Sequence, residues 1–180
     1  MRWWLIAVSA VVAVAVSGCD DTRSEMPASP PPPTSSSSQS GMADVHEVRA
    51  GGTAQLVDAR LAGHDGFDRL VFEFADRVPG YTVGYQPLPA HADGSGAEIP
   101  LPGATALVQV TLTPASGWDE DARTYVGPST LSADTATVTE VKAAGDFEAV
   151  LNWAAGLRAK VPFTVDVLDG PPRLVIDFQR

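Results

Sequence analysis

DGFDRLVFEF, at residues 65–74, recurs as DGPPRLVIDF at residues 169–178 of this 180-residue chain. Each copy starts with an Asp-Gly pair, which is typical of a turn, and continues with residues that alternate as in a β-strand. Successive side chains of a strand point to opposite faces. The core-facing side is therefore predicted to carry Leu70, Phe72, Phe74, Leu174, Ile176 and Phe178. The outward side is predicted to carry Arg69, Val71, Glu73, Arg173, Val175 and Asp177.

The arginine and the acid of one copy are four residues apart, or about 13 Å along a strand, which is too far for a direct ion pair. If the copies are antiparallel neighbours, Arg69 can face Asp177 and Arg173 can face Glu73. Each such exposed pair would stabilise the fold by less than about 1 kcal/mol. If the copies lie on separate sheets, the same four residues form two outward patches that could bind carboxylates or sugar hydroxyls. The sequence leaves both arrangements open, and these four residues are the candidate ligand-binding residues.

The rest of the chain after residue 45 also follows a period of two, with Gly, Pro and Asp between the apolar runs. We expect strands at 54–62, 69–75, 81–86, 106–113, 136–142, 147–154, 163–168 and 173–178. About eight short strands without a clear long helix predict an all-β fold, an antiparallel β-sandwich with an internal two-fold sequence repeat. Residues 147–157 also fit one face of a helix, and we favour the strand.

The N-terminus has the pattern of a secretory signal: Arg2, an apolar run from Leu5 to Val16, and small residues before Cys19. The run would make a helix of only about 18 Å, too short to cross a bilayer. Val16-Ser17-Gly18-Cys19 reads as a lipobox. We therefore expect residues 1–18 to be a lipoprotein signal peptide and Cys19 to carry lipid such as palmitate. An uncleaved membrane anchor is the alternative.

Residues 19–44 are rich in proline and serine and poor in large apolar side chains, which predicts a disordered tether. Residues 45–180 have the length of one domain. The expected location is the extracytoplasmic face of the cell membrane, with the domain held there by the lipid on Cys19. The single cysteine leaves no disulfide, so a hydrophobic core must hold the domain together.

The net charge of −10 disfavours nucleic acid as a partner, because phosphates repel an acidic surface. Residues that could support catalysis are sparse. His46, His64 and His91 lack the spacing of a zinc site and are expected in solvated loops. We predict no catalytic residues, no metal and no cofactor.

Two acidic clusters are weaker candidates for a site. Asp119-Glu120-Asp121 follows Trp118, and carboxylates beside an aromatic ring suit a sugar or calcium site, although a solvated turn is the simpler reading. Asp93 with Glu98 has too few oxygen ligands for a calcium loop. Trp153 and Tyr125 are expected in the core.

The stretch FTVDVLDGPPRLVIDF at residues 163–178 resembles the signature of AMIN domains. The region from Ala54 onward resembles the AMIN-like domain of actinobacterial lipoproteins, which is similar to the non-catalytic targeting modules of peptidoglycan amidases and pilus secretins. The resemblance implies a β-sandwich of two related sheets. It also implies binding of cell-wall material through Arg173 and Asp177, and through Arg69 and Glu73.

The leading hypothesis is a non-catalytic binding module for peptidoglycan or an envelope protein, anchored to the membrane at Cys19. One alternative is a small hydrolase of wall carbohydrate that uses Glu73, Asp119 or Glu120 as acid and base. Such an enzyme needs two carboxylates about 5–10 Å apart in a cleft. Another alternative is a carrier that holds an apolar ligand between the sheets, which requires an apolar cavity of several hundred Å³.

Overall fold

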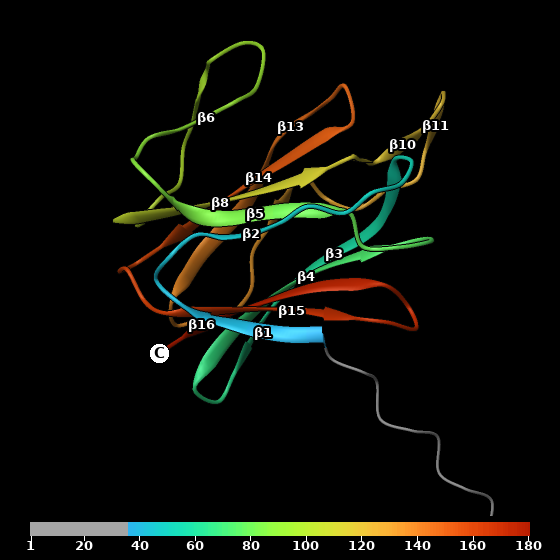
Figure 1. The fold of residues 1–180 in the computed structure, drawn as a ribbon. Coiled ribbons are helices and arrows are strands. Elements are labelled where there is room, and N and C mark those ends of the chain that lie inside the picture. The colour runs from blue at the N-terminus through green and yellow to red at the C-terminus, as the bar shows by residue number, and fades with distance from the viewer. Residues whose placement is uncertain (1–35) are drawn as a thin grey trace, which may run out of the picture. The chain divides into compact units, whose positions relative to one another are not determined.

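The computed structural model describes residues 36–180, which form strands joined by turns and loops (Figure 1). Within this range there is no helix, and hence none long and apolar enough to span a bilayer. The predicted signal peptide, Cys19 and tether residues 19–35 lie outside the described residues. Residues 36–41, which belong to the segment predicted as a tether, form an edge strand.

Six strands form the first sheet, in the order β1-β15-β16-β4-β3-β9. Their bounds are β1 Ser36–Gly41, β15 Phe163–Leu168, β16 Arg173–Gln179, β4 Phe67–Phe74, β3 Ala54–His64 and β9 Ala115–Ser116. All neighbours are antiparallel except β3 and β9. The two copies of the repeated motif are β4 and β16, so they are adjacent strands of one sheet and do not lie one on each sheet.

The second sheet also has six strands, in the order β12-β13-β14-β8-β5-β2, and all its neighbours are antiparallel. Their bounds are β12 Thr130–Leu131, β13 Val138–Phe147, β14 Val150–Leu157, β8 Ala106–Thr113, β5 Gly80–Gln86 and β2 Val45–Glu47. The eight predicted strands correspond to β3, β4, β5, β8, β13, β14, β15 and β16.

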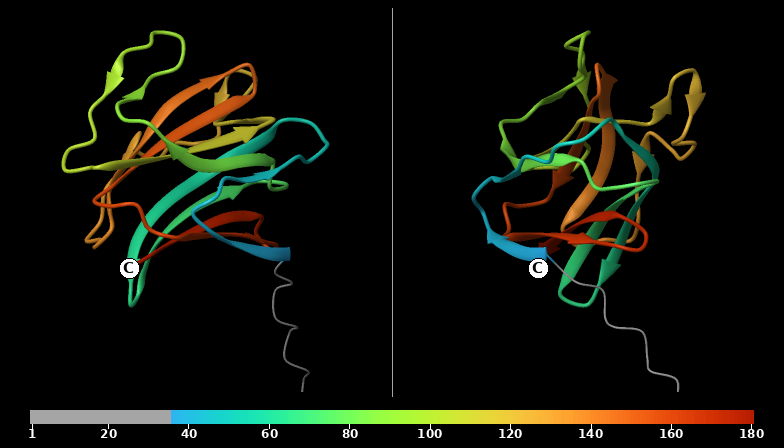
Figure 2. Two further views of the ribbon diagram at one scale, coloured as in Figure 1. Left: turned by 60° about the vertical axis from the view of Figure 1, so that its left-hand side comes forward. Right: turned by 45° about the vertical axis from the view of Figure 1, so that its right-hand side comes forward.

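The core lies between the inner faces of these two sheets, which form the two layers of an antiparallel β-sandwich (Figure 2). The predicted inward residues of both motif copies are buried, each with at most 1% of its surface exposed. They meet Trp153 of the second sheet, whose ring centroid is 5.6 Å from that of Phe72 and 5.8 Å from that of Tyr125. Burial of each large apolar side chain stabilises the fold by about 1.5–3 kcal/mol. Trp153 and Tyr125 are core residues, as predicted.

The predicted strand 147–154 is displaced in the structure. Phe147 ends β13 and is exposed, and Val150 begins β14 opposite it. Glu148 and Ala149 between them have φ values of 50° and 58°, so they form the two central residues of a tight hairpin turn. Positive φ at both central positions matches the right-handed twist of the flanking strands. The sequence hid this turn because neither residue is glycine or asparagine.

Two stretches without a strand prediction form short hairpins. Residues 87–105 contain β6 (Ala90–His91) and β7 (Glu98–Ile99), which place Ala90 and Ile99 against Leu107 in a second apolar cluster. Residues 114–135 contain the hairpin of β10 (Trp118–Asp119) and β11 (Ala122–Arg123), together with β9 and β12. These connections add surface features to the sandwich.

Candidate functional site

The strongest candidate from the sequence is the outward face of β4 and β16. Their antiparallel register places Asp177 opposite Arg69 and Arg173 opposite Glu73. Arg69 donates two hydrogen bonds to Asp177, from Nε to Oδ1 and from Nη2 to Oδ2, each 2.7 Å long. The first of the two predicted cross-strand contacts is therefore present as a bidentate ion pair.

This ion pair is partly buried. The side chain of Asp177 is 12% exposed and that of Arg69 is 39% exposed, and the guanidinium also lies 5.0 Å from the ring centroid of Phe67. The hydrogen bond to Asp177 raises the pKa of Arg69 above its ordinary value, against the opposing effect of burial. Because water screens the exposed arginine, the pair stabilises the fold by about 1 kcal/mol or less. Both groups have an internal partner, so neither is fully available to a ligand.

The second predicted contact does not form. Glu73 instead accepts a 3.0 Å hydrogen bond from Nη2 of Arg60, which projects from the neighbouring strand β3 and also contacts Asp58. Burial alone would lower the pKa of Arg60, but hydrogen bonds to Glu73 and Asp58 and their negative charges outweigh it and raise that pKa. Arg60 thus completes a row of charged residues that runs across three strands.

Arg173 is left with one side-chain hydrogen bond among residues 36–180, from its Nε to the carbonyl oxygen of Pro171 at 3.2 Å. The terminal nitrogens of its guanidinium have no carboxylate partner there. Of the four predicted residues, Arg173 is the one whose terminal guanidinium nitrogens donate no hydrogen bond to residues 36–180. A guanidinium of this kind suits the recognition of a carboxylate.

The residues on this face point outward as predicted, but three of them are not exposed. Val71, Val175 and Asp177 point away from the sandwich core but are buried, with only 3% of Val175 exposed. Val71 lies between Arg60 and Val175 in the sheet register. Arginine stems cover apolar neighbours while their charged ends reach water, which explains how a valine can be buried on an outer face. The face is a charged surface over an apolar strip.

Sequence reasoning missed Arg60, because a strand pattern does not say which strand lies beside β4. The alternation in 54–62 did place Asp58 and Arg60 on one face of a strand. It did not show that this strand lies beside β4, where Arg60 meets Glu73. We call the set Asp58, Arg60, Arg69, Glu73, Arg173 and Asp177 the charged face.

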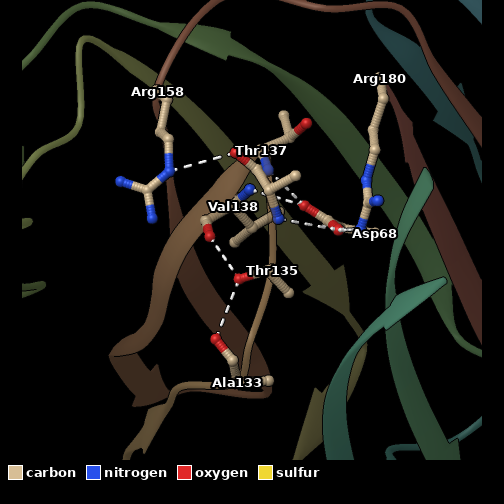
Figure 3. A network of polar contacts seen from close by, with 8 residues as sticks. Asp68, Ala133, Thr135, Thr137, Val138, Arg158 and Arg180 are labelled. Carbon is tan, nitrogen blue, oxygen red and sulfur yellow. Dashed lines mark hydrogen bonds and ion pairs between the residues drawn. The ribbon is translucent and has the colours of Figure 1, made fainter. Parts of the chain in front are cut away.

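A second residue missed by the sequence argument is Asp68, which is fully buried. Its carboxylate accepts hydrogen bonds from the backbone N–H groups of Thr137 at 2.6 Å, Val138 at 3.0 Å and Ala136 at 3.3 Å (Figure 3). It also accepts one from Nη2 of Arg180 at 3.1 Å. Asp68 thereby ties β4 of one sheet to the start of β13 in the other.

Burial alone would raise the pKa of Asp68, but the hydrogen bonds from Val138, Thr137, Arg180 and Ala136 outweigh it and lower that pKa. The sequence does indicate that Asp68 points inward, since position 68 lies on the same face of the strand as Leu70 and Phe72. In the second copy of the motif the equivalent residue is Pro172. The role of Asp68 is to join the two sheets.

The weaker candidates do not gather into a site. His46, His64 and His91 are exposed and lie in strands β2, β3 and β6, whereas loops were expected. Asp119, Glu120 and Asp121 are exposed on the β10–β11 hairpin. Asp93 accepts a 2.7 Å hydrogen bond from the buried Asn152. Within residues 36–180, no three His, Cys, Asp or Glu side chains are placed to hold a metal ion.

Two of the clefts on the surface of residues 36–180 are candidate binding sites. One has a volume of about 260 Å³ and one carboxylate, that of Asp146, in its lining. The other has a volume of about 370 Å³ and is lined by Tyr85, Lys160 and neighbouring residues without a carboxylate. Neither cleft therefore has the pair of carboxylates that glycoside hydrolysis requires. Both are open and of mixed polarity, unlike the enclosed apolar cavity of a lipid carrier.

Comparison with protein families adds one finding. The family model of the AMIN-like domain matches residues 54–180, which is more than two thirds of the chain. The match begins at the first residue of β3 and includes the whole charged face. Neither the curated proteins nor the solved structures include a significant match to this chain.

Proposed function

We propose that this chain, which belongs to the AMIN-like domain family, is a lipid-anchored envelope protein whose domain binds peptidoglycan without catalysis. Membership of this family supports the proposal, because AMIN-like domains are in general non-catalytic binding modules associated with peptidoglycan. The lipobox at Cys19 supports attachment to the outer side of the membrane. An envelope protein is the alternative partner at the same surface.

The observation that carries the proposal is the unequal use of the arginines on the charged face. Arg69 and Arg60 are held by Asp177 and Glu73, whereas Arg173 keeps its terminal donors without a carboxylate partner among residues 36–180. Peptidoglycan carries free carboxylates on its peptide stems, and a guanidinium binds a carboxylate through two parallel hydrogen bonds. Arg173 is the expected contact, and the two internal ion pairs hold the surrounding surface in shape.

Retention on purified sacculi tests this proposal. The full chain, in detergent, is expected to sediment with sacculi at low salt and to be released progressively above about 0.3 M salt, because exposed charges are screened. Arg173→Ala should lower retention at least fivefold. Arg158→Ala is the matched control, since it removes an exposed arginine whose Nε bonds Ala136 elsewhere on the domain.

Two results would refute the assignment. If the wild-type chain does not sediment with sacculi, the wall is not the ligand, and cross-linking in intact cells would then be used to find an envelope protein bound at residue 173. If the wild-type chain sediments and Arg173→Ala lowers retention no more than Arg158→Ala does, the charged face is not the binding surface. Arg158 is exposed and Arg173 is half-buried, and neither forms an ion pair among residues 36–180, so a folding defect is not expected and circular dichroism would check it.

A further inference from the structure

We propose that the 260 Å³ cleft beside the β10–β11 hairpin binds one uncharged pyranose unit of a glycan. The cleft shares only Leu56 of β3 with the strands of the charged face and includes none of the charged-face residues, and its ligand needs no charge. The inference thus goes beyond the proposed function and stands without it.

Buried core residues and a hydrogen bond between its two walls hold the cleft in shape. Its floor is formed by the buried core residues Leu56, Leu151 and Trp153. One wall is the β10–β11 hairpin and the other is the end of β13, and Asp146 joins them by accepting a 2.8 Å hydrogen bond from the backbone N–H of Gly117. A ligand would thus meet walls that are held in place before it binds, which lowers the entropic cost of binding.

Two glycines of the lining lie where the chain packs too closely for a side chain. A Cβ added to Gly127 would lie 2.6 Å from the hydroxyl of Tyr125, and one added to Gly145 would lie 2.1 Å from Oδ2 of Asp93. Neither position has room for a side chain, so bare backbone forms those parts of the lining. Ala143 and Ala144 continue the same wall with small side chains. Close approach of the backbone to neighbouring groups is one of the recurrent uses of glycine.

The side chains at the opening combine an aromatic plane with hydrogen-bonding groups. Trp118 is 44% exposed, which is unusual for such a large apolar side chain, and Arg123 lies over its ring at 5.1 Å. The guanidinium of Arg123 has no ion pair or hydrogen bond with any residue in 36–180, although the backbone of Arg123 pairs with Trp118. Asp146 has a second carboxylate oxygen besides the one bound to Gly117. In the floor of the cleft, the indole N–H of Trp153 also lacks a hydrogen-bond acceptor within the described part of the chain.

These groups select the chemical class of the ligand. A pyranose presents a flat C–H face that fits an indole ring, and hydroxyls that both donate to a carboxylate and accept from a guanidinium. A cation is disfavoured because Arg123 already places a positive charge over one face of Trp118, and the sugar would pack against the other face. An anion is disfavoured because Asp119, Glu120 and Asp121 follow Trp118 directly on the hairpin and Asp146 lies in the wall.

The volume sets the size of the ligand. A cleft of about 260 Å³ is slightly below the range of roughly 300–1,000 Å³ for sites that enclose drug-sized molecules. One sugar ring fits such a space, and the rest of a glycan chain would extend into solvent past the exposed Trp118. Affinity for a single ring is expected on the order of 1 mM.

Nuclear magnetic resonance of the ¹⁵N-labelled full chain in detergent tests the proposal. Chitotriose represents N-acetylated glycans, maltotriose represents glycans without N-acetyl groups, and glucuronic acid serves as the anionic sugar. We expect at least one neutral sugar to shift the indole N–H signals of Trp118 and Trp153 in a saturable manner. The neutral sugar that binds more tightly identifies the class of glycan, and glucuronic acid should bind at least fivefold more weakly.

Variants then locate the site. Trp118→Ala and Arg123→Ala should each weaken sugar binding at least tenfold, while Arg60→Ala on the charged face should leave it unchanged. The inference is wrong if neither neutral sugar causes saturable shifts, if glucuronic acid binds as well, or if the two cleft variants bind like wild type. Retention on sacculi is measured separately, so a failure of this site and a failure of the charged face give different results.

Discussion

Replacement of Asp68 by alanine tests the role of the buried carboxylate that joins the two sheets. The change removes an acceptor of four hydrogen bonds, of which those from Thr137 and Val138 are the shortest. The two backbone N–H groups would then be left without a partner in a region closed to water. The bond from Ala136 is longer, at 3.3 Å, and Arg180 can turn toward solvent, so these two contribute less.

The magnitude follows from the two short bonds. An unsatisfied buried donor costs about 1–3 kcal/mol, so Asp68→Ala should lower the free energy of unfolding by about 3–5 kcal/mol. Asp68→Asn keeps one acceptor oxygen and should cost about half as much. Arg180→Ala removes only the half-exposed partner and should cost less than about 1 kcal/mol. Urea unfolding of the full chain at pH 7, followed by tryptophan fluorescence, measures these differences.

The dependence on pH supplies an independent check. The pKa of Asp68 is lower in the folded chain than in the unfolded chain, where it is about 3.9. The carboxylate therefore stabilises the fold above pH 4, and this contribution is lost as the pH falls through the folded-state pKa. The stability difference between wild type and Asp68→Asn should shrink between pH 7 and pH 2. A difference that stays constant over this range, or an alanine variant as stable as wild type, would refute the reasoning.

Three further predictions concern other parts of the chain. Glu148→Asn with Ala149→Gly should raise the free energy of unfolding by about 1–2 kcal/mol, because both native residues have positive φ; urea unfolding without a gain would show that the turn is unstrained. Burial and then the hydrogen bond to Glu47 raise the pKa of Tyr81 to about 12. Ultraviolet titration should therefore show that Tyr81 ionises two units above an exposed tyrosine. In Glu47→Gln, Tyr81 should ionise at a lower pH than in the wild-type chain. Its contribution to stability is then lost between pH 10 and pH 12. Cys19→Ala should move the protein from the membrane fraction to the soluble fraction, and continued sedimentation with membranes would contradict lipid anchoring.

The strand pattern was readable in the sequence because alternation is a local property. Each of the eight predicted strands has a counterpart, and the inward residues of both motif copies lie in the core. The exception, residues 147–154, failed at a turn formed by Glu148 and Ala149. Neither residue type signals positive φ, so the pairing of β13 with β14 imposes the conformation.

The candidate site was readable only in part. The register of β4 and β16 brought Arg69 to Asp177, one of the two alternatives that the sequence left open. It also placed Arg173 opposite Glu73, but these side chains form no ion pair, because Arg60 from β3 takes that carboxylate. The cleft shows the same limit, since Trp118 and Asp146 are far apart in the chain and meet only where the β10–β11 hairpin packs beside β13.

By itself, the sequence determined the fold class, the family and the two faces of each main strand, because these depend on residue type at a spacing of two. Tertiary structure alone decided that the motif copies are neighbours, that Asp68 joins the sheets and that Arg173 keeps donors without a partner among residues 36–180. These outcomes depend on which strands lie side by side. That order is set by how two complete sheets bury their apolar faces together, and no single segment of the chain encodes it.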